Sequence, residues 1–450
     1  MLLIGNGKIV TRDTAHPFIE DGAVAIDDEL IRELGETRAL RAKYPDAEYI
    51  DAKGRLVMPG FINTHMHYYS TFARGISLGG KPAATFGEVL SGLWWRLDKQ
   101  LSLDDVYYSC MGPMIDQIRA GVCSVIDHHA SPFAVEGSLF KIAEAAKLFG
   151  LRSNLCYEVS DRDGEEITQA GIRENIDFAK HCQKQNDDML GALFGLHAQM
   201  TLGEKTLDRC VQAAAEAGIG FHIHAAEGVE DLNDAISKYG MPVIRRLHNK
   251  GLLSEKSIAV HCIHIDEEEI ELLKESGAAV VHNPQSNMAN AVGVSPVQEM
   301  MKRGVLVGLG TDGYSADVLD SYKTAAILHK HSSGLPSAFW AEPPLMFFEN
   351  NKKIIERFLN SNAGEKTGGK LGIIAKDHYA DIIIVDYKGP TPVNQNTINS
   401  HILFGITGRH VDTTIINGKI IMKDRVLLNI DEEELMAKSR EQAEKLWKRI

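Results

Sequence analysis

The 450-residue sequence lacks any hydrophobic run long enough to cross a membrane, since a spanning helix needs about 20 consecutive apolar residues. It also lacks clusters of Lys and Arg. The 61 acidic residues outnumber the 48 basic ones, the net charge is −13, and charges of both signs are dispersed along the chain. Nucleic-acid binding requires concentrated positive charge. We therefore expect neither a membrane nor a nucleic acid as a partner.

Cysteine is scarce, and its spacing shows no metal or redox motif. The six cysteines include no CxxC pair, so we expect reduced, mostly buried thiols. The first residues, MLLIGNGKIVTRD, show no basic segment followed by an apolar one and a small-residue cleavage site, so we expect no secretory signal. Together these observations favour a cytoplasmic protein.

The two ends of the sequence share a residue pattern that differs from that of the middle. Both contain short apolar or alternating runs broken by Gly and Asp, a pattern typical of β-strands: LLIGNGKIVT, GAVAIDDELIRELG, ADIIIVDY and TTIINGKIIMKD. We predict that residues 1–57 and 369–450 are the two parts of one small, discontinuous β-sandwich domain. The second part should end in a helix over about residues 431–449, because an acidic first turn and a basic last turn suit the helix dipole.

The middle of the chain, residues 58–368, alternates short apolar runs with segments of helical period such as TLDRCVQAAAEAG. Eight continuous apolar runs are candidate buried strands: GFINTH, VCSVIDHH, RSNLCYEV, LGALFGLH, GIGFHIHA, SIAVHCIH, AAVVHNPQ and VLVGLGTD. This pattern predicts an α/β fold, a (β/α)₈ TIM barrel. The stretch from Tyr68 to Arg119 is unusually long for a connection and could cover the barrel mouth.

Histidines gather at the ends of these runs, where TIM barrels place their catalytic groups. His65 and His67 end the first run and point to the same face, because side chains in a strand alternate with a period of two. His224 ends the fifth run, and Asp312 ends the eighth. Three imidazole nitrogens and one carboxylate oxygen suit Zn²⁺ or another first-row divalent ion and leave a position for water.

Four motifs, PGFINTHMH, HIHAAE, HCIH and GTDG, resemble in order and spacing the amidohydrolase superfamily, in its deaminase and chlorohydrolase branch. The likeness extends over essentially the whole chain. Within that branch, LWWRLD, SVIDHHASP and VHNPQSNM resemble the SsnA group of aminohydrolases, which has no firm substrate. The resemblance implies that His65, His67, His224 and Asp312 hold one divalent metal, Zn²⁺ or alternatively Fe²⁺. A single ion is expected because His197 stands where two-metal relatives often place a carboxylated Lys.

The same resemblance implies catalytic roles for three residues. Glu227 would pass a proton to the ring nitrogen and then to the leaving amine, although it could instead cap the following segment. His261 would polarise the reacting centre or hydrogen-bond the attacking hydroxide, and Asp312 would accept a proton from water. For substrate contacts, each weighed against a structural role, the candidates are His197, His129, Asn287 and Trp95.

The leading hypothesis is an aminohydrolase, a hydrolase acting on carbon–nitrogen bonds other than peptide bonds. It would deaminate an N-heterocycle of the purine, pteridine or pyrimidine type, by hydroxide generated at the metal and with release of ammonia. The alternative is hydrolysis of a cyclic amide or a carbon–halogen bond with the same residues. The third and most remote hypothesis is a non-catalytic binding protein built on a degenerate barrel. The partners expected are therefore a small N-heterocyclic substrate and, from the resemblance, other copies of the chain in a homo-oligomer.

Overall fold

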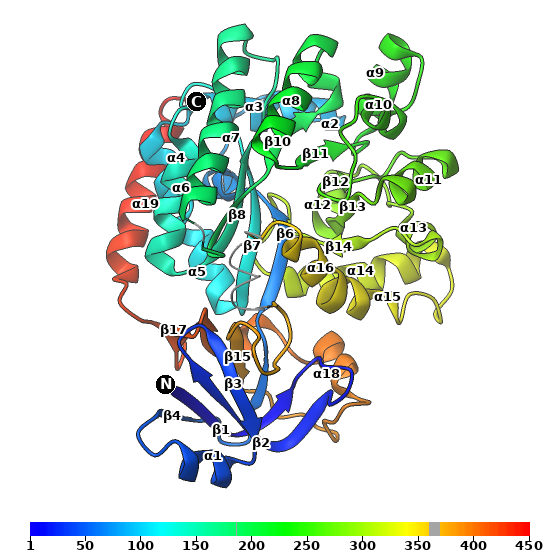
Figure 1. Cartoon of the computed structure of the whole chain (residues 1–450). Coiled ribbons are helices and arrows are strands. Elements are labelled where there is room, and N and C mark those ends of the chain that lie inside the picture. The colour runs from blue at the N-terminus through cyan, green and yellow to red at the C-terminus, as the bar shows by residue number, and fades with distance from the viewer. Residues whose placement is uncertain (186, 360–369) are drawn as a thin grey trace.

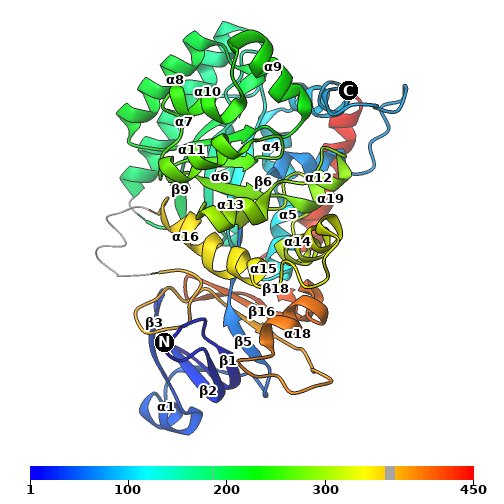
Figure 2. The same cartoon turned by 90° about the vertical axis from the view of Figure 1, so that its right-hand side faces the viewer.

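The computed structural model describes residues 1–185, 187–359 and 370–450. Two views at right angles show an upper body of strands surrounded by helices and a smaller layer below it (Figures 1 and 2). Strands from the start of the chain and from the part after residue 370 lie together in the lower layer. Among the described helices, none combines the length and the apolar composition needed to span a bilayer.

The upper body contains parallel strands with almost entirely buried side chains, arranged in sheets of four and five strands. The strands are β6 (Phe61–Met66), β7 (Val122–His129), β8 (Arg152–Tyr157), β9 (Leu190–Ala192), β10 (Phe194–Ala198), β11 (Phe221–Ala225), β12 (Ile258–His261), β13 (Ala279–His282) and β14 (Val307–Leu309). Their continuous apolar sequence follows from this environment, because parallel strands covered by helices are buried on both faces.

Two links join the two sheets into a closed barrel. Val159 pairs with Leu196 between β8 and β10, and Met66 pairs with Asp312 between β6 and the end of β14. At the second link, the backbone amides of residues 311 and 312 donate to the His65 carbonyl at 2.9 and 3.1 Å. The predicted α/β barrel fold is therefore confirmed. The closure also brings the first and last strands of the barrel into contact at their carboxyl ends.

Helices alternate with the barrel strands, among them α5 (Met111–Arg119), α6 (Ser138–Phe149), α7 (Glu165–Gln185), α8 (Glu204–Ala217), α10 (Val243–Asn249), α11 (Glu267–Ser276), α13 (Val297–Arg303) and α14 (Val318–Ser333). Local sequence sets their ends. Asp266 and Glu269 cap each other's backbone amides at the start of α11. That helix stops at Gly277, where a φ of 70° favours glycine.

The lower layer is one sheet of nine strands to which both ends of the chain contribute. It contains β1 (Leu2–Val10), β2 (Phe18–Asp27), β3 (Leu30–Gly35), β4 (Glu48–Asp51), β5 (Leu56–Pro59), β15 (Ile382–Val385), β16 (Val411–Ile416), β17 (Lys419–Lys423) and β18 (Val426–Leu427). The two parts meet where β5 pairs antiparallel with β15. The domain boundaries at 57/58 and 368/369 remain predictions, and the second falls outside the described residues.

The last helix, α19 (Glu432–Trp447), leaves the lower sheet and packs beside the barrel helices α4 (Leu103–Ser109) and α5, as its red ribbon shows (Figure 1). Asp431 caps its start by accepting from the Glu434 amide. Trp447 Nε1 donates to the Phe72 carbonyl at 2.7 Å, and Ser439 Oγ donates to a carbonyl of α4 at 3.0 Å. The end of the chain is thereby fixed to the barrel.

A buried arginine links the barrel to the lower sheet. Arg152 of β8 is fully buried, and its Nε and Nη2 lie 3.2 and 3.3 Å from the two carboxylate oxygens of Asp381, next to β15. Its Nη1 donates to the Asp188 carbonyl at 2.6 Å, and its guanidinium lies over the ring of Tyr379. Breaking a buried pair leaves the remaining charge without compensation, which is strongly destabilising.

We therefore expect Arg152→Ala to lower the free energy of unfolding by about 3–5 kcal/mol, because the Asp381 carboxylate would stay buried without its partner. Urea unfolding followed by circular dichroism measures the change. The control is Lys438→Ala, which removes an exposed ion pair within α19 and should leave the unfolding midpoint unchanged. Equal unfolding midpoints for Arg152→Ala and the wild type would show that the Arg152–Asp381 pair does not stabilise the contact between the barrel and the lower sheet.

Candidate functional site

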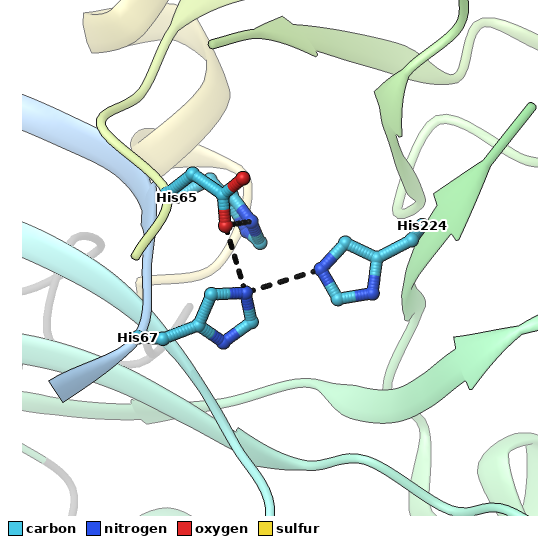
Figure 3. Close-up of side chains that lie close together, drawn as sticks. His65, His67 and His224 are labelled. Atoms are coloured by element: carbon cyan, nitrogen blue, oxygen red, sulfur yellow. Dashed lines mark hydrogen bonds and ion pairs between the residues drawn. The ribbon is translucent and has the colours of Figure 1, made fainter. Parts of the chain in front are cut away.

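Four buried side chains meet at the carboxyl ends of three barrel strands. His65 lies in β6 and His67 directly follows it, His224 lies in β11, and Asp312 follows β14. One nitrogen or oxygen atom from each lies within 4.8 Å of the others. Figure 3 shows the three imidazole rings facing one another across a small space. The structure therefore brings together the four residues predicted from the sequence as metal ligands.

The Nδ1 atoms of the three histidines face away from this point and have partners of their own. His67 Nδ1 lies 2.5 Å from the His128 carbonyl oxygen, and His224 Nδ1 lies 2.8 Å from the His197 carbonyl oxygen. A carbonyl oxygen only accepts, so both Nδ1 atoms must carry the proton. His65 Nδ1 lies 2.9 Å from Nε2 of His222. Such outer partners orient the rings of metal-ligating histidines and fix their tautomers.

In their neutral forms, His67 and His224 therefore present the lone pairs of their Nε2 atoms to each other. His67 Nε2 lies 3.2 Å from His224 Nε2 and 3.0 Å from Asp312 Oδ1, and His65 Nε2 lies 3.5 Å from the same Oδ1. The buried Nε2 of His65 has no hydrogen-bond partner. Acceptor atoms held this close repel one another unless a cation lies between them. The donor set of three imidazoles and one carboxylate fits a divalent metal ion.

The backbone is strained at several of these positions. His261 and Asp312 have φ angles of 71° and 54°, and Ala226, just before Glu227, has a φ of 51°. Residues other than glycine adopt this left-handed region only at a cost of about 1–3 kcal/mol each. Strain of this kind gathers at functional sites, because the surrounding structure must hold the side chains in a required position.

Beside the four predicted ligands, Glu227 and His261 form a second group with Asp312. His261 Nε2 lies 3.4 Å from Glu227 Oε2 and 3.7 Å from Asp312 Oδ2. Burial, together with the nearby charge of Asp312, raises the pKa of Glu227 well above its usual value. A carboxyl group with a raised pKa keeps its proton to a higher pH than a free one and can deliver it to a reacting group.

The predicted substrate contacts divide into two pairs. His197 and Trp95 line the cavity above the site, with ring centres 6.1 Å apart. His129 and Asn287 are not among the described residues that line this cavity. Their polar atoms face other side chains: His129 Nε2 lies 2.9 Å from Ser131 Oγ, and Asn287 Oδ1 lies 2.8 Å from His261 Nδ1. In this geometry Asn287 positions the ring of His261. Contact of His129 and Asn287 with the substrate remains a prediction.

Sequence reasoning did not single out two residues of the cavity wall. Glu158 is the next-to-last residue of the run RSNLCYEV, its Oε1 lies 3.3 Å from His67 Nδ1, and burial raises its pKa to about 7. Its place at the end of a barrel strand is the signal that could have identified it. Ser286 lies in α12 (Pro284–Ala289) and donates to Asp312 Oδ2 at 2.5 Å. Its role depends on where α12 packs, and no sequence pattern shows this.

A covering segment, residues 86–100, closes one side of the cavity. It consists of α2 (Phe86–Val89), η2 (Leu90–Trp94), α3 (Trp95–Leu97) and η3 (Asp98–Gln100). Five of its residues line the cavity: Phe86, Leu90, Trp94, Trp95 and Asp98. The segment lies within the long connection that the sequence suggested as a cover for the barrel mouth.

Comparison with known proteins agrees with this geometry. The chain is 32% identical to a 5'-deoxyadenosine deaminase of Methanosarcina mazei, over 100% of this chain and 99% of that protein. It is 30% identical, over the same shares, to a 5-methylthioadenosine/S-adenosylhomocysteine deaminase of Pelotomaculum thermopropionicum.

Among solved structures, an adenosine deaminase from Xanthomonas campestris with bound zinc superposes with a TM-score of 0.85 at 22% identity, covering 99% of this chain and 98% of that one. The zinc complex of atrazine chlorohydrolase TrzN from Arthrobacter aurescens has a TM-score of 0.78 at 20% identity, covering 98% and 100%. At these identities the likeness shows the fold alone.

Family models give the assignment. The model described as the amidohydrolase family matches residues 56–421, and a bacterial imidazolonepropionase-like composite domain matches residues 22–47. The first match covers the barrel strands and part of the lower sheet, and it includes all four clustered ligand residues. The narrower likeness to the SsnA group stays a prediction. From the motifs, the fold and these matches together, the chain belongs to the amidohydrolase family.

Proposed function

We propose that this protein is a hydrolytic deaminase of an aminated N-heterocycle, most closely of the purine type, and that it releases ammonia. The observation that supports this best is the group of Glu227, His261 and Asp312 beside the four ligand residues, all at one cavity. Relatives at 30–32% identity over the full chain are named as deaminases of adenosine-type compounds. Deamination needs a proton donor for the ring and for the departing amine, and Glu227 is suited to both tasks.

A divalent metal held by His65, His67, His224 and Asp312 would lower the pKa of a bound water to about 7 and so supply a nucleophile at neutral pH. Zn²⁺ is the proposed ion, because a three-nitrogen, one-oxygen donor set suits it and a structural neighbour contains zinc. The same donors also suit Fe²⁺.

The residues of this chain then have separate tasks. Asp312 Oδ1 faces the histidine nitrogens, while Oδ2 lies beside His261 and can accept a proton from the attacking water. Glu227 donates its proton to the ring nitrogen next to the attacked carbon, which removes the negative charge that attack would otherwise place on the ring. Glu227, now a carboxylate, can take the proton of the hydroxyl group added at the attacked carbon and pass it to the amino group, which leaves as ammonia and not as an amide anion. The proton held by Asp312 then restores the protonated form of Glu227, so the two protons of the water end on the ring and on ammonia.

The geometry also bears on the alternative reactions. Hydrolysis of a carbon–halogen bond expels a halide, which needs no proton, whereas amine expulsion requires the donor that Glu227 provides. This difference favours deamination over dehalogenation. A homo-oligomer and a cytoplasmic location remain predictions from the sequence.

The first test is ammonia release from a panel of amino-purines, aminopteridines and aminopyrimidines by the zinc-loaded protein. We expect turnover of at least one purine-type compound and none by Asp312→Asn, which lacks an anionic ligand and the proton acceptor. Ring opening or halide release on the same protein, without ammonia release from any panel member, would contradict the deaminase proposal.

The second test isolates proton transfer from metal binding. Glu227→Gln should retain the metal, because Glu227 is not one of the four clustered ligands, yet lower kcat by about 10²–10⁴-fold. Metal analysis and steady-state kinetics on the same sample measure both effects. Glu275→Gln makes the same Glu-to-Gln change on the surface of α11 and should match the wild type in metal content and kcat. A Glu227→Gln enzyme with wild-type kcat would exclude this residue from the mechanism.

A further inference from the structure

Acidic side chains and histidines line the cavity above the site. Six carboxylate residues line it: Asp98, Glu158, Glu227, Glu230, Asp231 and Asp312. Within the described part of the chain, no Lys or Arg is among the lining residues. The whole chain also has a net charge of −13, so its long-range field opposes the approach of anions.

Four of these carboxylates have partners within the site or the backbone. Asp312 and Glu227 belong to the reacting groups, and Glu158 Oε1 lies 3.3 Å from His67 Nδ1. Asp231 accepts from the backbone amides of residues 226 and 200 at 2.9 and 3.1 Å. The remaining two, Asp98 and Glu230, lie along the covering segment, where the part of a substrate remote from the reacting ring would extend.

Asp98 presents an unpaired oxygen. Its Oδ2 accepts from Arg162 Nη2 at 2.9 Å, while Oδ1 is buried and has no hydrogen-bond partner. Arg162 is also bound through Nε to Ser160 Oγ at 3.0 Å, and its guanidinium lies over the ring of Trp95. Arg162 and Asp98 thus offset each other's charge; the buried Nη1 of Arg162 has no hydrogen-bond partner, and Arg162 is not one of the residues that line the cavity. It leaves no uncompensated positive charge on that wall.

Glu230 contacts the covering segment near its start, at the end opposite to Asp98. It lies in α9 (Val229–Tyr239), and its Oε1 accepts from the backbone amide of Gly87 in α2 at 3.3 Å. Around this contact the wall is apolar, because Phe86, Leu90 and Met200 also line the cavity. An anionic group placed here would lose its hydration without gaining an oppositely charged partner, and this raises the free energy of binding.

We propose that the enzyme selects substrates whose portion remote from the reacting ring has no negative charge: free bases or uncharged nucleoside-type compounds, and not nucleotides or carboxylate-bearing derivatives. This specificity rests on the proposed deamination and narrows its substrate class. It arises because the Glu230 carboxylate repels an anion, the apolar wall desolvates it, and no lining Lys or Arg compensates it.

The test uses matched pairs that differ in the remote charge: adenosine with adenosine 5'-monophosphate, and 5'-deoxyadenosine with adenosine 5'-carboxylic acid. For the zinc-loaded enzyme we expect kcat/KM for the uncharged member to exceed that of the anionic one by about 100-fold or more. Calorimetric binding of the deaminated products, inosine and inosine 5'-monophosphate, should show the same preference without turnover.

Glu230→Gln tests the cause of the preference. The amide oxygen of Gln can still accept from Gly87, so the fold should hold, while the loss of charge should reduce the discrimination between pair members by about 10-fold. Glu275→Gln makes the same change in net charge on the surface of α11 and should leave the discrimination unchanged.

Equal kcat/KM values within each pair would overturn the inference while leaving the deaminase proposal intact. A preference for the anionic members, lost in Arg162→Gln, would also overturn it and would identify Arg162 as an anion-binding group. If no compound is deaminated but inosine binds better than its phosphate, the charge selection is supported and the proposed reaction fails. Absence of binding by both products would overturn the inference together with the purine-type proposal.

Discussion

Closure of the barrel between β6 and β14 sets the position of the candidate site. Two backbone amides, of Thr311 and Asp312, donate to one carbonyl, that of His65, and join residues almost 250 positions apart in the sequence. This contact places the Asp312 carboxylate against the imidazoles of His65 and His67. It also forces a left-handed backbone at Asp312, at an energetic cost that the packed barrel must offset. The ligand geometry is therefore a consequence of how the barrel closes.

Around that contact, the surrounding residues restrict each reacting group to one orientation. Backbone carbonyls hold two of the histidine rings by Nδ1, so their Nε2 atoms face the same point. Helix α12 holds the opposite side, with Ser286 bonded to Asp312 and Asn287 bonded to His261. Preorganisation of this kind lowers the cost of reaching the transition state, because few side chains must move during the reaction. It also explains why buried polar residues concentrate at this end of the barrel.

The sequence predicted the barrel and the clustered residues from two sources. Apolar runs mark buried parallel strands and strand ends mark the catalytic face, while the resemblance to the amidohydrolase superfamily selected His65, His224 and Asp312 among the polar residues at those ends. The same rule did not resolve which polar side chains reach the cavity. His129 directs its Nε2 toward Ser131, and Asn287 directs its amide oxygen toward His261, because side-chain direction depends on the packing of the following loop or helix. Contacts between distant elements, such as Ser286 with Asp312, have no sequence signature.

The central claim is that one metal ion at the four clustered ligands activates the water used in deamination. The most direct measurement is ammonia release from a purine-type substrate while metal-free protein is titrated with Zn²⁺. The account predicts that activity is absent without metal, rises in proportion to added Zn²⁺ and levels off at one equivalent per chain, while His224→Ala gains none. Full activity in the metal-free protein, or a rise that continues to two equivalents, would contradict it.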